Sequence, residues 1–329
     1  MSVARMPQVL DRRLALDLAQ VAERCAVAAA RLRGRGDEEA ADLAATRTCH
    51  REMNEIPLSA TVVIGEGLEG ESDLLFAGET LGSGGMEVDL AVDALEGSTL
   101  CAKNMEGSIT VIAIAERGSL LKVPAAYMEK LAIGPGYPEG IVSLSQSPQD
   151  NVRALAEAKG VPPADITALI LDRPRHAPLI EAVRKTGAAV KLITDGDVAG
   201  IIHTTNPQES GVDIYLGAGG AAEGVLAAAA LRCIGGQMQG RLVLDTEKKR
   251  EHAKALGIRD FAKTYSLEEM VRGDCLVAAT GVTDGALLKG VRFGREMIET
   301  DTIVLRAATG TVRRIATEHR DFRKFKLEA

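Results

Sequence analysis

The sequence predicts an α/β protein in which layers of helix pack on sheets. Between residues 152 and 233, short apolar runs such as 166–171 and 212–216 alternate with helical segments such as 176–186 and 221–233. Strands that alternate with helices are typical of βαβ units and of a parallel or mixed sheet. Apolar residues at helical spacing over 11–32 add a helix before the first strand pattern. A chain of 329 residues can form one large domain or two halves of about 150 residues each.

The first half of the chain begins with two helices. Gly34 and Gly36 end the first helix, and Asp37 is placed to cap the second, which runs to about residue 54. We then expect a strand at 61–64, a glycine-rich turn at 81–85 and a strand at 88–92 that ends in Asp93. Residues 108–115 and 120–123 are predicted to pair as two strands.

The second half follows the βαβ rhythm. We expect helices at 152–159, at 176–186, from Asp195 onward and at 221–233. We expect strands at 166–171, 189–193, 212–216, 275–279, 302–306 and 311–315. The best boundary lies near Pro148, which predicts an N-terminal α+β half at 1–148 and a C-terminal α/β half at 149–329, within one continuous unit.

Composition excludes several classes of protein. The net charge is −7, Trp is absent and aromatic residues make up 3% of the chain, which argues against a nucleic-acid partner. Five scattered cysteines without a C-x-x-C pair fit a reducing compartment. The sequence has neither a signal-peptide pattern nor an apolar run long enough to cross a membrane. A cytoplasmic protein without membrane contact is therefore expected.

Acidic residues recur where predicted strands end. Glu66 follows the strand at 61–64, Asp93 ends the strand at 88–92, and Glu96 comes three residues later. Glu223 opens a helix after the strand at 212–216. Ligands of open α/β sheets bind beyond the carboxyl ends of strands. Any one of these acids reads equally well as a turn or cap residue, whereas the whole set points to a common site.

The chemistry of such a set is that of a hard divalent cation. Mg²⁺ and Mn²⁺ prefer oxygen ligands, and they would relieve the repulsion between converging carboxylates. Two metals can hold an attacking water and a phosphate oxygen together, which is most of what phosphoryl transfer requires. Gly97, Ser98 and Thr99 could present backbone N–H groups to an anion. The Ser98 hydroxyl is placed to orient a water.

A dinucleotide-binding turn is the alternative from another enzyme class. Residues 65–70 match G-x-G-x-x-G, and residues 217–222 match the variant that ends in Ala. The first match places Glu66 and Glu69 against a pyrophosphate. The second has Gly235 and Gly236 where an acidic residue should follow. Both features disfavour this hypothesis.

An ordered set of motifs, from about residue 14 to 317, resembles the class II fructose-1,6-bisphosphatases, a branch of the lithium-sensitive, metal-dependent phosphatases. The matching segments are Gly34-Arg35-Gly36-Asp37, 61–67, 88–93 with Glu96-Gly97-Ser98, 127–130, 173–176, 195–198, 219–224 and 238–241. The Asp-x-x-Glu-Gly-Ser motif alone is shared by the wider superfamily, whereas the ordered set is specific to this family.

The resemblance implies an alternating α/β/α/β/α sandwich of the sugar phosphatase or inositol monophosphatase type. It implies Mg²⁺- or Mn²⁺-dependent hydrolysis of the 1-phosphate of fructose 1,6-bisphosphate, as in gluconeogenesis, by a homo-oligomer that is a dimer or a tetramer. The metal ligands would be Asp42, Glu66, Asp93, Glu96 and Glu223, mostly in the N-terminal half. The substrate-binding residues would be Glu96, Gly97, Ser98, Tyr127, Arg173, Arg175, Asp195, Asp197, Gly219 and Gly220.

The chain also departs from the family pattern. Ser98, the hydroxyl that would help to activate water, stands where the family usually has Thr. Gly70 stands where the family has an Asp thought to take part in the chemistry, and Glu69, Glu71 or Asp73 is a candidate to replace it. We expect the catalytic residues to be Ser98, Glu66 and Glu71. Ala94 replaces the usual Pro, and Glu38 replaces a frequent Lys. A catalytically weakened paralogue in a regulatory role, or a sedoheptulose 1,7-bisphosphatase, is therefore the alternative.

Two further residues keep two interpretations each. His176 is either a residue at the start of a helix or a phosphate contact. Lys130, within the Tyr127 segment, is equally consistent with a structural salt bridge and with a substrate contact.

Overall fold

The computed structural model describes residues 10–325, and its contacts divide the chain into two compact units. The first unit is formed by the segments before Leu121 and after Met270, and the second by Leu121–Met270. The boundary expected near Pro148 differs from this division, because that residue begins α4 (Pro148–Lys159) inside the second unit. Strand β7 (Tyr127–Ile133) pairs with two later strands of the second unit. The residues from Leu121 to Pro148 therefore belong to the second unit.

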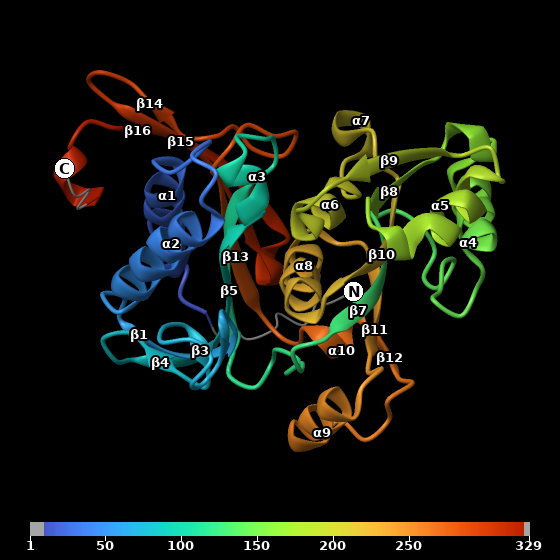
Figure 1. Ribbon diagram of the computed structural model, residues 1–329, viewed down its shortest axis with the longest axis horizontal. Helices are drawn as coiled ribbons and strands as arrows, with labels where there is room; N and C mark the ends of the chain where they lie inside the picture. The colour runs from blue at the N-terminus through green and yellow to red at the C-terminus, as the bar shows by residue number, and fades with distance from the viewer. Residues whose placement is uncertain (1–9, 326–329) are drawn as a thin grey trace, which may run out of the picture. The chain divides into compact units, whose positions relative to one another are not determined.

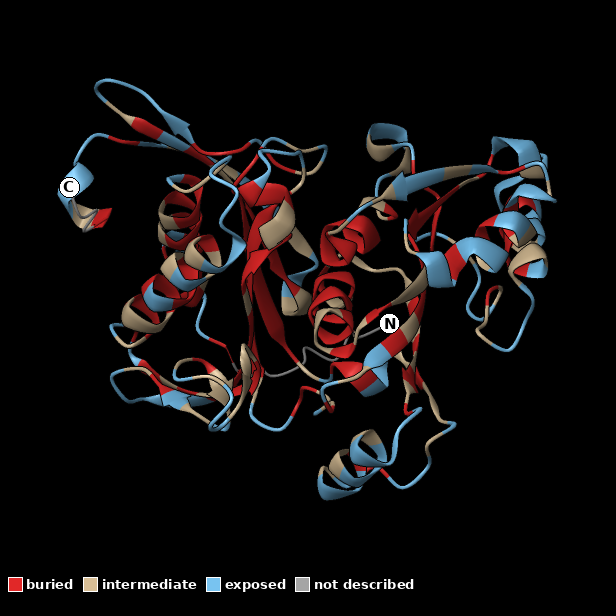
Figure 2. Cartoon of the chain, in the orientation of Figure 1, coloured by how far each residue is buried: buried red, intermediate tan, exposed pale blue. Residues whose placement is uncertain are grey.

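A mixed sheet of eight strands forms the first unit, in the order β14-β15-β13-β6-β5-β1-β4 with β16 paired to β15. Its strands are β1 (Leu58–Ile64), β4 (Thr80–Leu81), β5 (Met86–Glu96), β6 (Ile109–Glu116), β13 (Cys275–Gly281), β14 (Arg292–Phe293), β15 (Ile298–Arg306) and β16 (Thr311–His319). β1 and β5 run parallel, whereas β6 is antiparallel to both β5 and β13. Figure 2 shows β5 and β13 buried over most of their length.

Two helices, α1 (Leu14–Ala30) and α2 (Glu38–Met53), lie side by side and cover one face of this sheet (Figure 1). α1 buries the residues that predicted its apolar face, Leu14, Leu18, Val21, Cys25 and Ala29. α2 begins where the sequence predicts. The side chain of Asp37 accepts a hydrogen bond from the backbone N–H of Ala40 at 2.9 Å, as an N-cap residue does.

The second unit is a six-stranded sheet with helices on both faces (Figure 1). Its strand order is β12-β11-β7-β10-β8-β9, with β8 (Thr167–Leu171), β9 (Ala189–Ile193), β10 (Ile214–Gly220), β11 (Gln237–Val243) and β12 (Thr264–Ser266). α4 and α5 (Ala177–Arg184) cover one face, where Leu131, Ile170 and Leu216 join their core. α6 (Asp197–His203) and α8 (Ala221–Ile234) lie on the other face, against β10.

Short elements complete the two units. They are β2 (Gly67–Leu68), β3 (Phe76–Ala77), α3 (Ser98–Ala102), η1 (Pro163–Asp165), η2 (Pro174–His176), α7 (Pro207–Ser210), α9 (Glu247–Ala255), α10 (Leu267–Met270), η3 (Ala307–Thr309) and η4 (Phe322–Phe325). Helices and mixed sheets occur in both units, which confirms the predicted α/β class. No helix within residues 10–325 is long and apolar enough to cross a membrane.

Three expectations for local structure were wrong. Residues 120–123 do not pair with β6, because Leu120 makes only an isolated bridge to Val271 and its N–H donates to the Asp89 carboxylate at 3.1 Å. β5 continues through Asp93 to Glu96 instead of ending at Asp93. Gly219 and Gly220 are the last residues of β10 rather than part of a turn.

We predict that Asp37→Ala lowers the free energy of unfolding by about 1 kcal/mol, because the N–H of Ala40 loses its acceptor. Urea denaturation followed by circular dichroism measures this change. Glu39→Ala is the matched control, since Glu39 is exposed in the first turn of the same helix and does not cap it. Equal losses in the two variants would show that the cap contributes nothing specific.

Candidate functional site

A one-residue bulge in β5 sets the directions of Asp93 and Glu96. Asp93 faces Val111 of β6 and Glu96 faces Ile109, so three steps along β5 match two along β6. Side chains alternate along a regular strand, and residues three apart would point to opposite faces. The extra residue cancels that difference. Ala94 and Leu95 accordingly both join the core beneath α1 and α2, which leaves Asp93 and Glu96 together on the other face of the sheet.

Two side chains of the neighbouring strand hold this bulge. A bulge interrupts the ladder and leaves backbone groups in need of partners. The hydroxyl of Thr110 donates to the carbonyl of Ala94 at 2.8 Å, and the hydroxyl of Ser108 donates to the carbonyl of Glu96 at 3.0 Å. Both hydroxyl residues are fully buried. These two hydrogen bonds from β6 and the residue before it therefore fix the backbone of β5 between Asp93 and Glu96.

Glu66 follows a second irregularity in the same sheet. The register of β1 against β5 shifts between Val62 and Ile64, two residues before Glu66. The Glu66 carboxylate lies close to α2. Hydrogen bonding with the Cys25 thiol and burial raise the pKa of the Cys49 thiol, and the charge of Glu66 contributes to this shift. β1 thus changes register two residues before Glu66, and β5 changes register between Asp93 and Glu96.

Asp42 lies on α2, two helical turns before Cys49 and on the same side of the helix. Burial raises the pKa of the Asp42 carboxyl, and no cationic side chain of residues 10–325 forms an ion pair with it. A partly buried carboxylate in this condition would be stabilised by a bound cation.

The turn after Glu66 carries the main departure from the family pattern. Gly70 has a φ of 86°, and a side chain added there would meet nothing within 4 Å. Its backbone conformation is one that Asp tolerates better than most residues. Glu71, which we expected to replace the missing Asp, is exposed, and its carboxylate accepts from the N–H of Leu68 at 3.4 Å. The turn thus has space for an acid at residue 70, but its positive φ would strain the backbone of any side chain placed there.

Gly97 and Ser98 come directly after Glu96. Gly97 is the N-cap residue of α3 and Ser98 is its first residue. The hydroxyl of Thr99 donates to the Glu38 carboxylate at 2.8 Å, which ties α3 to the start of α2. Ser98 itself is partly exposed. The proposed water-orienting hydroxyl therefore lies two residues from the end of the bulged strand, on an anchored turn.

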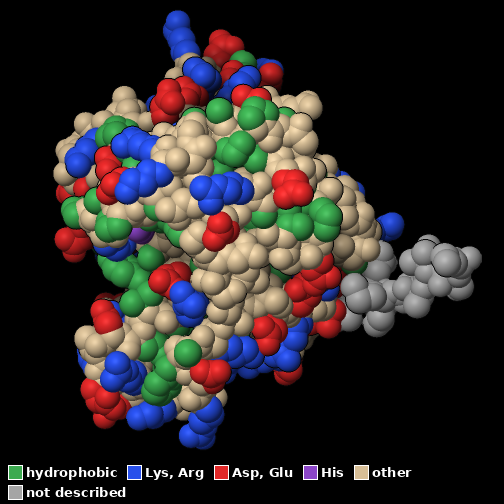
Figure 3. Space-filling view, turned by 90° about the vertical axis from the view of Figure 1, so that its right-hand side faces the viewer, with side chains coloured by type: hydrophobic (Ala, Val, Ile, Leu, Met, Phe, Trp, Pro, Cys, Tyr) green, Lys and Arg blue, Asp and Glu red, His purple; other side chains and the backbone are tan. Residues whose placement is uncertain are grey.

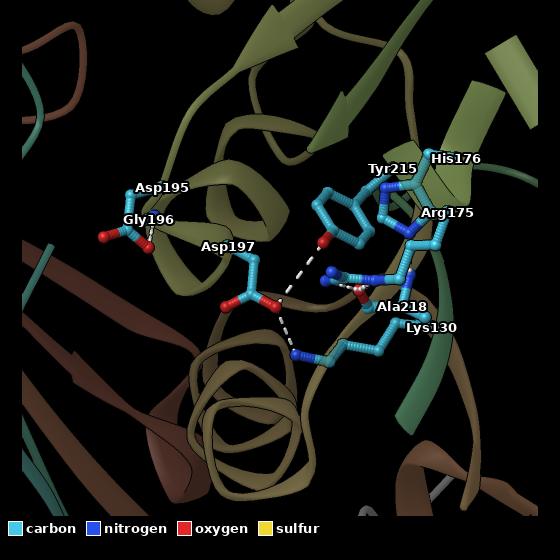
Figure 4. A network of polar contacts seen from close by, with 8 residues as sticks. All are labelled: Lys130, Arg175, His176, Asp195, Gly196, Asp197, Tyr215 and Ala218. Atoms are coloured by element: carbon cyan, nitrogen blue, oxygen red, sulfur yellow. Dashed lines mark hydrogen bonds and ion pairs between the residues drawn. The ribbon is translucent and has the colours of Figure 1, made fainter. Parts of the chain in front are cut away.

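A buried ion pair organises the predicted substrate residues of the second unit. Lys130 lies on β7 with no exposed surface, and its ammonium group pairs with the Asp197 carboxylate at the start of α6 (Figure 4). The hydroxyl of Tyr215 lies 3.5 Å from the same carboxylate. Asp195 turns back to accept from the N–H of Gly196 at 3.0 Å. Of the two interpretations of Lys130, the structure favours the salt bridge.

Two glycines at the end of β10 make room for these acids. A side chain on Gly219 would collide with the Asp197 carboxylate, and one on Gly220 would collide with the Glu223 carboxylate. Burial raises the pKa of Glu223, the Lys130 charge opposes this, and Asp197 and Asp195 raise it further. One carboxylate oxygen of Glu223 is buried without a hydrogen-bond partner. Glu223 is therefore, like Asp42, a carboxylate whose pKa burial raises, but the charge of Lys130 partly compensates it.

His176 is a neutral structural link beside the predicted phosphate-binding arginines. Its Nδ1 lies 2.7 Å from the carbonyl of Leu171, and the N–H of Ala218 donates to its Nε2 at 2.9 Å. The proton must therefore be on Nδ1. Burial lowers the pKa of His176, and the charges of Arg175 and Arg173 lower it further. The structure supports a structural role at the start of α5 for this residue.

Arg175 and Tyr127 stand at the edge of a cavity of about 420 Å³. The Arg175 guanidinium lies 4.6 Å from the centre of the Tyr127 ring and donates to the carbonyl of Ala218 through Nε at 3.1 Å and Nη2 at 2.6 Å. Arg241, paired with Glu129, also lines the cavity. Figure 3 shows this face of the second unit hollowed beside hydrophobic side chains. The guanidinium of Arg173 donates to the carbonyl of Asp172 at 3.3 Å, and its backbone N–H donates to the carbonyl of Leu171 at 2.9 Å.

The structure places every predicted site residue but does not test the predicted roles. Within residues 10–325, no three His, Cys, Asp or Glu side chains meet in an arrangement that would hold a metal. The four ligands predicted in the first unit occupy α2, the loop after β1, and β5; Glu223 is in the second unit. Their oxygen donors, the burial of Asp42 and the buried Glu223 oxygen without a hydrogen-bond partner fit Mg²⁺ or Mn²⁺.

Comparison with known proteins decides the family. A model of the bacterial, glpX-encoded fructose-1,6-bisphosphatases matches residues 12–319. The chain belongs to this family. It is 39% identical, over 94% of its length and 96% of the relative's, to a "D-fructose 1,6-bisphosphatase class 2/sedoheptulose 1,7-bisphosphatase" of Synechococcus sp. (strain JA-3-3Ab). It is 37% identical to a protein of that name from Prochlorococcus marinus (strain NATL1A), with 94% and 97% coverage.

Membership of the class II fructose-1,6-bisphosphatases makes the chain a phosphatase, a hydrolase of carbohydrate metabolism. It also confirms the resemblance found in the motifs. Sequence reasoning did not find the supports of the site, Thr110, Ser108, Ala218 and Tyr215. A signal for Lys130 was present, because it stands between Met128 and Ala132 on the alternate positions of an apolar strand.

We predict that Lys130→Met lowers the free energy of unfolding by about 3–5 kcal/mol, because Asp197 is left buried with its charge uncompensated. Urea denaturation measures the loss, and the double variant Lys130→Met/Asp197→Asn should recover a large part of it. Lys185→Met is the control, because its partner Glu181 is exposed and an exposed pair contributes little to stability. A Lys130→Met loss no larger than that of the control would contradict a tight buried pair.

We predict that His176 titrates below pH 6.5, its ordinary pKa, because burial and two arginines lower its pKa. The unfolded chain then binds a proton that the folded chain does not, so stability is present above about pH 6.5 and falls as the pH drops below it. Nitrogen-15 NMR of the imidazole should show a proton on Nδ1 at pH 6.5. A titration midpoint at or above 6.5 would sink this prediction.

Proposed function

We propose that the chain hydrolyses the 1-phosphate of fructose 1,6-bisphosphate to give fructose 6-phosphate and inorganic phosphate, with Mg²⁺ or Mn²⁺. The observation that carries the proposal is the bulge in β5, which directs Asp93 and Glu96 to one face beside Gly97 and Ser98. Membership of the fructose-1,6-bisphosphatase family supports the choice of substrate. The curated relatives are named for both fructose 1,6- and sedoheptulose 1,7-bisphosphate, and the second substrate is therefore the alternative.

The acidic residues would hold the metal. Asp42, Glu66, Asp93, Glu96 and Glu223 are the proposed ligands, all hard oxygen donors. Bound there, the metal would neutralise charge on the phosphate and lower the pKa of a water. The Ser98 hydroxyl would form a hydrogen bond with the attacking water. This bond would orient the water toward the phosphorus atom. Water adds to phosphorus, the bond from phosphorus to the C1 oxygen breaks, and that oxygen takes a proton.

The second unit supplies groups suited to the part of the substrate that does not react. Arg173 and Arg175 are suited to the 6-phosphate, because a guanidinium binds phosphate through two parallel hydrogen bonds. The cavity beside Arg175 and Tyr127 offers about 420 Å³ for a sugar phosphate. Carboxylates accept from sugar hydroxyls, and Lys130 would hold Asp197 in a fixed orientation for that purpose.

Two further properties belong to the proposal. The family resemblance indicates a dimer or a tetramer, which light scattering of the purified protein would measure. A cytoplasmic setting is supported by the cysteines, because all five are free and buried.

The test is phosphate release from fructose 1,6-bisphosphate by the purified protein with Mg²⁺, with Mn²⁺ and with chelator. We expect release that depends on metal. Glu96→Gln should lower turnover at least about 100-fold, because even residues that only support a ligand cost about 10–100-fold, and it should leave the circular dichroism spectrum unchanged. Glu87→Gln is the matched control, since Glu87 is exposed on the same strand.

The outcomes separate the alternatives. Full activity in Glu96→Gln would refute the assignment of that residue. Release from sedoheptulose 1,7-bisphosphate alone would change the substrate. If the protein binds sugar phosphate and metal without turnover, it is the weakened paralogue, and Gly70→Asp is the next variant. The space around residue 70 is open to that side chain, although its φ of 86° strains a residue other than Gly, so the stability of this variant is measured alongside its activity.

A further inference from the structure

A basic cavity lies in the first unit away from the acids of β5. It has a volume of about 430 Å³ and lies between the start of α1 and the strands β15 and β16. In the sheet, β13 and β6 lie between β15 and β5. Three spacings of about 4.8 Å each place β15, at the cavity, roughly 14 Å from β5, which carries the acids. The cavity therefore shares no residue with the proposed metal site.

Three arginines line this cavity, and none of the other lining residues within 10–325 is a carboxylate. Arg12 comes from the residues before α1, Arg306 ends β15, and Arg313 lies on β16. Arg12 and Arg313 are exposed, and neither forms an ion pair within residues 10–325. The chain as a whole has a net charge of −7. Arg306 is paired with Asp274, whereas Arg12 and Arg313 bring two positive charges without such a partner to the same hollow, which favours a bound anion.

Hydrogen bonds hold Arg306 in a fixed position in the cavity wall. It is 5% exposed, and it donates to the carbonyl of Leu10 at 2.6 Å and to the Asp274 carboxylate at 3.3 Å. Asp274 also accepts from the N–H of Ala308 at 3.0 Å, which fixes the corner between the two strands. The Nε of Arg306 is buried without a hydrogen-bond partner. This arginine is thus locked in the wall with part of its hydrogen-bonding capacity unused.

The rest of the lining indicates the kind of anion. The hydroxyls of Thr309 and Thr311 lie 2.6 Å apart at the same corner and provide neutral hydrogen-bonding groups. Leu16 and Ile315 form an apolar part of the wall, and Leu16 is 57% exposed. Arginine forks and hydroxyls suit a phosphate group, whereas an exposed leucine suits an apolar body.

We propose that this cavity binds a small phosphorylated organic molecule, with its phosphate on Arg12 and Arg313 and its apolar part against Leu16. Arg306 supplies charge from the wall and keeps β15 and β16 in place. The site is independent of the proposed hydrolysis, because none of its residues belongs to the proposed catalytic or substrate-binding set.

The experiment uses two phosphonates, which a phosphatase cannot hydrolyse. Methylphosphonate and phenylphosphonate are titrated into the full chain in chelator, and isothermal calorimetry gives the number of sites and the affinity. The variants are Arg12→Gln/Arg313→Gln, Arg173→Gln/Arg175→Gln and, as a matched control for lost charge, Arg320→Gln/Arg323→Gln, two exposed arginines elsewhere in the first unit.

We expect the Arg12→Gln/Arg313→Gln variant to lose one binding site that the control retains, with at least about tenfold weaker binding there. Phenylphosphonate should bind that site more tightly than methylphosphonate, and Leu16→Ser should remove the advantage. Equal binding by this variant and the control overturns the proposal. Loss of a separate site in Arg173→Gln/Arg175→Gln reports on the proposed substrate site alone, so failure of one proposal is distinguishable from failure of the other.

Discussion

The candidate site of the first unit depends on one extra residue in one strand. Without the bulge between Asp93 and Glu96, alternation along β5 would direct one carboxylate into the core beneath α1 and α2. Burying a lone carboxylate there would cost far more than the bulge does. Ser108 and Thr110 satisfy the backbone carbonyls that the bulge displaces, so the irregularity is stable. The sheet therefore determines where the acids lie. Because Gly97 and Ser98 follow β5 directly, the sheet also determines where that turn begins.

In the second unit, acidic side chains are held in place by a buried positive charge instead of by a shift in strand register. Asp197, Asp195 and Glu223 come close enough to influence one another, and Lys130 is the cation enclosed among them. A buried pair of this kind gains little stability over an apolar pair, but it holds its members in one geometry. Gly219 and Gly220 are required because the carboxylates occupy the space where side chains would stand. Together these features exchange stability for a fixed orientation of acidic groups.

Much of the fold could be predicted from local patterns, and the exceptions have a common cause. Helical spacing and a capping residue predicted α1, α2 and the Asp37 cap, because those signals lie within a few residues of each other. The extent of β5 was missed, because its continuation past Asp93 depends on partners in β6 that no local pattern shows. The boundary near Pro148 differed for the same reason, since β7 pairs with strands far ahead in the chain. Sequence motifs identified the acids individually, whereas only the register shows which of them share a face.

The chain path has a consequence for how the protein is made. β6 and β13 are neighbours in one sheet, yet the whole second unit is inserted between them in the sequence. The N–H of Leu121 donates to the carbonyl of Met270, so the insert leaves and returns at one point. Domains tend to fold as their residues emerge during synthesis. The inserted unit can therefore complete its core on the ribosome before β13, β15 and β16 of the first unit have been synthesised. During that interval the edge of β6 that later pairs with β13 is unpaired, and an unpaired edge can pair with the wrong strand.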